Sequence, residues 1–161
     1  MGQSPSADLF YGYDLKDLTE SGSYDDLRPA WMGGVDDDGE ERPEVDADEH
    51  LASKLGWVNQ PYPANGGSSN DWGNNRARMH ELVADYPVEL DYYGYLDGED
   101  PGYCVRVKAC VQSAGDWGST EVAPLAVDPA WDDQLAEYMR LMELPVPSGK
   151  SPGWHMNCSY G

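Results

Sequence analysis

Two segments of alternating apolar and charged residues, separated by a turn sequence, constrain the fold more than any other feature of this chain. Residues 88–95 and 103–111 alternate with a period of two, and an Asp-Gly pair at 97–98 and a Pro-Gly pair at 101–102 lie between them. Alternation of this kind is typical of strands with one buried face, and such pairs are typical of turns. We therefore expect an antiparallel β-hairpin.

The alternation also sets a register for the hairpin, because the apolar residues of both segments must share the buried face. Glu89 and Asp91 then share the opposite face with Arg106 and Lys108, so two of the ten basic residues are matched locally by acids. The positions assigned to the buried face are Val88, Leu90, Tyr92, Val105, Val107 and Ala109.

Further elements follow from the same kind of pattern. Strands are expected at 8–13 and 154–160, where apolar and polar residues alternate. Helices are expected at about 48–55, at about 75–86, and from Pro129 onward, where apolar residues follow a 3.6-residue period. The expected fold is α+β, with an antiparallel sheet of about four strands and two to three helices packed on one side.

We expect residues 1–161 to form a single domain with an exposed acidic loop near 33–47. Six Trp and eleven Tyr supply large apolar surfaces, which favours a packed core over disorder. The formal net charge of −20 excludes nucleic acid as a direct ligand, because that affinity depends on Lys and Arg contacts to phosphates. Anionic membrane surfaces are disfavoured for the same reason.

The negative charge is densest between residues 36 and 49, where nine of fourteen positions are carboxylates. The beginning of this run is typical of an exposed loop, and its end is typical of a helix start with Asp46 or Asp48 as N-cap. We assign these nine acids as candidate partner-binding residues: Asp36, Asp37, Asp38, Glu40, Glu41, Glu44, Asp46, Asp48 and Glu49. An acidic surface steers association with basic partners.

Aromatic residues beside acids are the second candidate surface. Trp72 follows Asp71 and Trp117 follows Asp116, and Trp is enriched at the energetically dominant positions of protein interfaces. We assign Trp72 and Trp117 as partner-binding residues. Packing of these rings beneath their own loops is the alternative.

No motif predicts catalysis, a metal site or a cofactor. The chain lacks a Gly-x-Ser-x-Gly nucleophile motif and a phosphate-binding loop, and the 36–49 run does not fit the calcium-loop pattern. Cys104 and Cys110 are six residues apart on one expected strand, about 20 Å, too far to share an ion or a disulfide. The odd cysteine count, and an N-terminus without a basic start and apolar run, lead us to expect a cytoplasmic protein.

Residues 7–15, Ala-Asp-Leu-Phe-Tyr-Gly-Tyr-Asp-Leu, lie in a short chain with four Lys and abundant Asp, Gly and Trp. This segment resembles small uncharacterised acidic proteins of actinobacteria and their bacteriophages. The resemblance implies a bacterial cytoplasm, that of the host for a phage protein, and carries no catalytic residues.

The sequence favours an acidic interaction protein, and in a phage setting a nucleic-acid mimic that inhibits a basic host or defence protein. A compact domain of this length is roughly 40 Å across, a length of duplex DNA that carries about 24 phosphates. A net charge of −20 is smaller than the charge of those phosphates. The protein could match it only if its acids lie on one side or if a homodimer doubles their number. The alternatives are a phage structural, assembly or adaptor protein, a salt-adapted surface, and a small enzyme with a carboxylate-bound metal.

Overall fold

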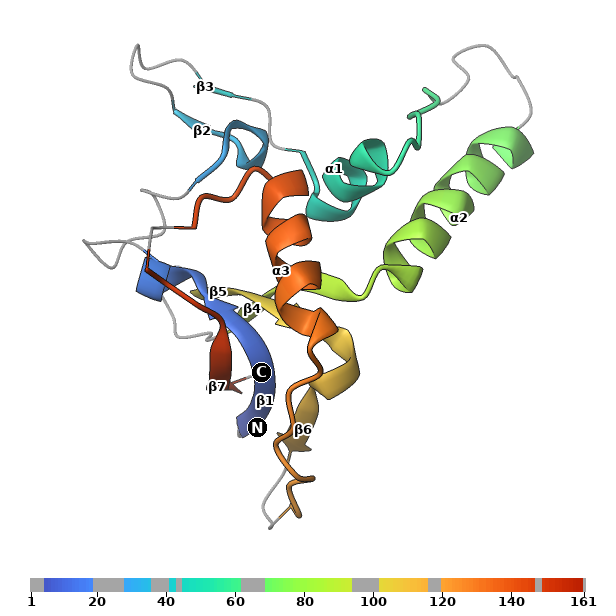
Figure 1. The fold of residues 1–161 in the computed structure, drawn as a ribbon. Coiled ribbons are helices and arrows are strands. Elements are labelled where there is room, and N and C mark those ends of the chain that lie inside the picture. Colours follow the sequence, from blue (N-terminus) through green and yellow to red (C-terminus); the bar gives the residue numbers. More distant parts are fainter. Residues whose placement is uncertain are drawn as a thin grey trace. The chain divides into compact units, whose positions relative to one another are not determined.

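The protein is described here by a computed structural model (Figure 1). Its chain divides into two compact units, one formed by Met1–Leu27 together with Pro87–Gly161 and the other by Arg28–Tyr86. The residues that the structure describes are 5–18, 28–35, 41–42, 45–61, 69–93, 102–115, 120–146 and 149–160.

The first unit contains an open, five-stranded antiparallel sheet, so the α+β class and the antiparallel sheet are confirmed. The path β4-β5-β1-β6 is hydrogen-bonded in that order, and β7 pairs with β1. Its strands are β1 (Pro5–Asp14), β4 (Val88–Tyr93), β5 (Gly102–Val107), β6 (Gln112–Gly115) and β7 (Gly153–Tyr160).

Strand β1 is the centre of this sheet. β7 pairs with residues 5–12 of β1, while β6 pairs with residues 6–9 and β5 with residues 12–14. Because residues 6–9 and Gly12 each have two partners, β5 and β6 must share the edge of β1 that β7 leaves free. The first strand in the chain is therefore held by three later ones.

The predicted hairpin register is confirmed, with Glu89 opposite Arg106 and Leu90 opposite Val105. The prediction of a strand through 111 is wrong at its end. Lys108–Cys110 form the 3-10 helix η4, which separates β5 from β6, and the Lys108 amide donates to the Pro87 carbonyl (2.9 Å). Lys108 and Ala109 therefore lie outside the β4–β5 ladder.

Helix α3 (Ala130–Leu141) packs against β5 and β4. Asp128 stabilises its start, because its Oδ1 accepts from the Ala130 amide (2.8 Å). The predicted apolar stripe supplies the core, with Leu135, Tyr138 and Met139 buried. A 3-10 helix, η1 (Leu15–Leu18), follows β1 and contributes two more buried leucines.

The second unit contains the short ladder of β2 (Gly34–Val35) with β3 (Glu41–Arg42), the 3-10 helix η3 (Ala30–Met32), and helices α1 (Ala47–Lys54) and α2 (Ser69–Asp85). α1 and α2 pack against each other around Ala52, Trp57 and Met79. Helix α2 begins six residues before its predicted start at 75, whereas α1 ends as predicted near Gly56, which has a φ of 91°.

Candidate functional site

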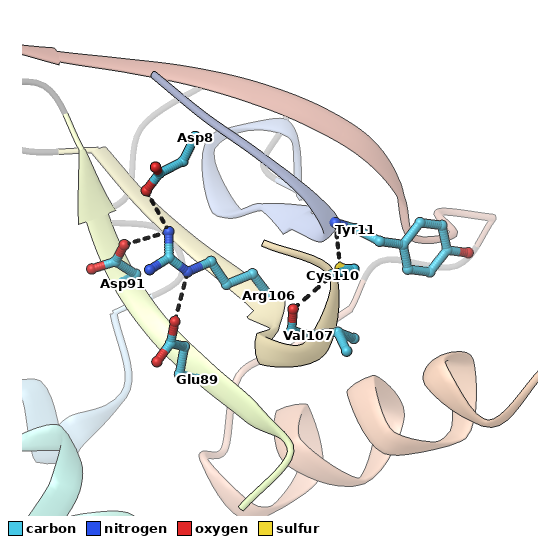
Figure 2. Close-up of polar contacts among 7 residues, drawn as sticks. All are labelled: Asp8, Tyr11, Glu89, Asp91, Arg106, Val107 and Cys110. Atoms are coloured by element: carbon cyan, nitrogen blue, oxygen red, sulfur yellow. Dashed lines mark hydrogen bonds and ion pairs between the residues drawn. The ribbon is translucent and has the colours of Figure 1, made fainter. Parts of the chain in front are cut away.

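Three carboxylates surround Arg106 on one face of the sheet (Figure 2). Arg106 Nε donates to Glu89 Oε1 (2.7 Å), and Nη1 donates to Asp8 Oδ2 (2.9 Å) and lies 2.8 Å from Asp91 Oδ2. The three acids come from β1 and β4, which flank β5. The β-sheet register therefore places all four side chains on one face.

Burial and pairing with carboxylates shift the pKa of the Arg106 guanidinium in opposite directions. Burial is the largest influence and lowers the pKa of Arg106. Hydrogen bonds from Arg106 to Glu89 and Asp8, together with the charge of Asp91, outweigh burial and raise that pKa overall. The side chain is 13% exposed and the acids are 31 to 33% exposed. One cation thus faces three carboxylates, and the cluster keeps a net negative charge at the surface.

The end of the acidic run has a structural role in the second unit. Asp46 Oδ1 accepts from the amides of Asp48 (2.9 Å) and Glu49 (3.4 Å), so Asp46 is the N-cap of α1. Glu49 accepts a hydrogen bond from Arg76 of α2, which joins the two helices. Of the three predicted residues in this stretch, two therefore stabilise the fold, and Asp48 is exposed.

Trp72 lies beside that ion pair. The Arg76 Cζ lies 6.0 Å from the centroid of the Trp72 ring, a cation–π geometry, and Trp72 is partly buried. Glu41 lies in β3, where only the backbone is described. The other predicted partner-binding residues lie outside the described residues: Asp36, Asp37, Asp38, Glu40, Glu44 and Trp117.

Three aromatic rings on the α3 side of the sheet form a second cluster. Tyr11 contacts Trp131 (5.7 Å between centroids) and Trp154 (5.6 Å), and the two Trp rings are 6.2 Å apart. The Tyr11 hydroxyl donates to Asp132 Oδ1 (2.8 Å). Burial first, and then this hydrogen bond, raise the pKa of Tyr11 to about 12. The bond ties α3 to the central strand.

We expect Tyr11→Phe to destabilise the protein by about 1.5 kcal/mol at neutral pH, because the bond to a charged acceptor is lost. The pKa of this phenol is higher in the folded protein than its ordinary value of 10.0, and the stability that this contributes is fully present below pH 10. That contribution disappears as pH rises toward about 12, because the unfolded chain loses the proton first. Urea denaturation at several pH values measures both effects. Tyr13→Phe is the control, because Tyr13 is buried on the same face without this bond; equal losses in both variants would contradict the assignment.

Cys110 fills the break between β5 and β6 (Figure 2). Its Sγ accepts from the Tyr11 amide (3.2 Å) and donates to the Val107 carbonyl (3.2 Å), so it replaces ladder bonds that η4 interrupts. Burial, the largest influence, raises the pKa of Cys110, and burial raises that of Cys104 to about 12. Cys158 is exposed, and all three thiols are free.

We therefore expect one thiol to react quickly with a chromogenic disulfide reagent in the native protein. Cys104 and Cys110 should react only after unfolding, because both are buried and the thiolate is the nucleophile. Stopped-flow absorbance at about pH 8, with and without guanidinium, measures the stoichiometry. Cys158→Ser should abolish the fast phase, and a fast phase that survives in this variant would contradict the burial of the other two.

Among the residues described, no group of three or more His, Cys, Asp or Glu side chains has the geometry to hold a metal ion. Within the same residues, no helix has the length and apolar character needed to cross a membrane. Comparison with protein-family models, with curated proteins and with solved structures finds no match.

Proposed function

We propose that this chain is an acidic, non-catalytic interaction protein that occupies the basic surface of a nucleic-acid-binding partner. The observation that supports the proposal most directly is the Arg106 cluster, where three carboxylates surround one cation and stay about one-third exposed. Folding therefore leaves excess negative charge at fixed positions. Fixed charge costs less entropy on binding than charge on a freely moving chain.

The acidic run adds charge to this proposal. Its last residues are placed by the fold, because Asp46 caps α1 and Glu49 binds Arg76 of α2. We propose that the acidic residues between 36 and 49 and the Arg106 cluster both contact the partner. The proposed setting is a bacterial cytoplasm, that of the host if the gene is carried by a phage, where the three free thiols stay reduced.

The experiment is a pull-down from a bacterial lysate at about 0.1 M and about 1 M salt, where Debye lengths are about 10 Å and 3 Å. We expect the captured partner to be lost at high salt and to be eluted at low salt by short duplex DNA. Elution by DNA distinguishes a nucleic-acid-binding partner from any other basic protein. If duplex DNA failed to displace the partner, the proposal that this protein mimics nucleic acid would be contradicted.

Two variants test the acidic run. In the first, Asp36, Asp37, Asp38 and Glu40 become Asn or Gln, which leaves the α1 cap intact. The matched control neutralises four exposed acids elsewhere, Asp17, Asp85, Glu121 and Asp133, with the same change in net charge. We expect the first variant to lose the partner and the control to keep it. If both variants retained the partner equally, the acidic run would not be part of the interface.

A phage structural or adaptor protein is the second candidate, and a different observation favours it. Val122, Leu125 and Val127 precede α3 and are 51%, 51% and 45% exposed. Contacts through these side chains would bury apolar surface and would persist at high salt. A partner that stays bound at about 1 M salt, and that Leu125→Asp releases, would support this function instead.

A further inference from the structure

Residues 120–129, which lead into α3, are exposed at every position (Figure 1). Six of them, 122–127, are consecutive and apolar, with the sequence Val-Ala-Pro-Leu-Ala-Val. Val122, Leu125 and Val127 are 51%, 51% and 45% exposed. A continuous apolar stretch of this kind is unusual at the surface of a folded protein, and it marks a site that another molecule covers. Residues 122–127 are called the apolar stretch below.

Hydrogen bonds hold the backbone of the apolar stretch in the folded chain. The Ala123 amide donates to Oε1 of Gln112 in β6 (2.6 Å). The Ala126 amide donates to the Pro124 carbonyl (3.0 Å), which closes a three-residue turn with Leu125 at its centre. Because these bonds already fix the backbone, covering the stretch costs little conformational entropy.

Charge indicates which molecule covers the apolar stretch. Among the residues that the structure describes, no other run of consecutive exposed positions is as long without a charged side chain. A basic partner is attracted by carboxylates, and the stretch offers it none. A second copy of this chain, with its net charge of −20, meets least repulsion where acids are absent. A two-fold axis brings the same patch of both copies together, and apolar side chains are complementary to themselves.

We propose that two copies of this chain associate through the apolar stretch, with Leu125 of each copy packed against the stretch of the other. Glu121 and Asp128 border the stretch, so like charges face each other at the edge of the contact. Salt screens that repulsion and leaves the apolar contact, so the dimer is stronger at high salt. The dimer presents the acids of two chains to a partner. The inference goes beyond the proposed function and does not depend on it.

The experiment is sedimentation equilibrium of the purified full chain over a range of concentrations, at about 0.1 M and about 1 M salt. We expect a monomer–dimer equilibrium with a lower Kd at the higher salt concentration. In the ¹⁵N-labelled chain, the amide NMR signals that shift with concentration should belong to residues 120–129. A monomer under all conditions, a dimer that dissociates as salt rises, or shifts confined to other residues would overturn the proposal.

Leu125→Ser should raise the Kd of the dimer at least about tenfold, because each copy loses a leucine side chain from the contact. Val58→Ser is the matched control, since Val58 is 73% exposed and lies in the second unit, outside the stretch. Both side chains are exposed, so both variants should keep the wild-type melting temperature. Equal Kd values in the two variants would overturn the proposal. If the chain stayed monomeric and Leu125→Asp released a partner in the pull-down, the stretch would belong to that partner instead.

Discussion

Replacing Arg106 by Met should destabilise the protein by about 3 to 5 kcal/mol, because three carboxylates would then share one face of the sheet without their cation. Met keeps most of the volume of the side chain, so the change tests charge rather than packing. Urea denaturation at neutral pH, followed by Trp fluorescence, measures the loss.

Arg140→Met is the control for this prediction. Arg140 also holds a carboxylate, binding Glu137 through two hydrogen bonds of 2.7 and 2.8 Å, but both side chains are at least half exposed. Exposed pairs contribute little because water and salt screen them. If Arg106→Met and Arg140→Met caused equal, small losses, the Arg106 cluster would have no structural role, and its acids would be no more fixed than other surface carboxylates.

The contrast between Asp8 and Glu89 shows how far the sequence predicts this site. Glu89 and Arg106 are joined by a hairpin, whose register follows from local alternation, so their pairing could be predicted. Asp8 lies 98 residues from Arg106 in the chain, and it reaches the cluster because β1 pairs with β5 at Gly12. No local pattern encodes which distant strand becomes a neighbour. The pairing of Glu89 with Arg106 could therefore be predicted, whereas the excess of three carboxylates over one cation could not.

The start of α2 shows a second limit. Residues 69–74 read Ser-Asn-Asp-Trp-Gly-Asn, and most of these have weak helix propensity, so periodicity alone predicts a start near 75. Tertiary contacts extend the helix, because Arg76 contacts both Trp72 and Glu49, and Asn75 holds the chain after α1. The periodicity therefore leaves Asp71 and Asn74 outside the predicted helix, whereas both lie in α2.

A single methyl group should cause a loss of similar size, in Gly12→Ala. A Cβ at Gly12 would lie 1.9 Å from the backbone oxygen of Val105 and 3.0 Å from the Cα of Arg106. Both neighbours are backbone atoms of β5, so the contact cannot be relieved by rotating a side chain. Because β1 and β5 pair only over Gly12–Asp14, the strands must separate at this position. We expect a loss of at least about 3 kcal/mol.

Gly153→Ala is the matched control, since Gly153 lies opposite Gly12 in the β1–β7 ladder and a Cβ there meets nothing within 4 Å. Alanine at that position should be neutral or slightly stabilising, because alanine loses less conformational entropy on folding than glycine. Denaturation compares stability, and amide hydrogen exchange locates the change. Gly12→Ala should expose amides between β1 and β5 while the β4–β5 hairpin stays protected, since its pairing is independent of β1. If Gly12→Ala were as stable as Gly153→Ala, β1 could not lie against β5 in this register. Asp8 would then have no route to Arg106, and the negative cluster that supports the proposed function would lose one of its three acids.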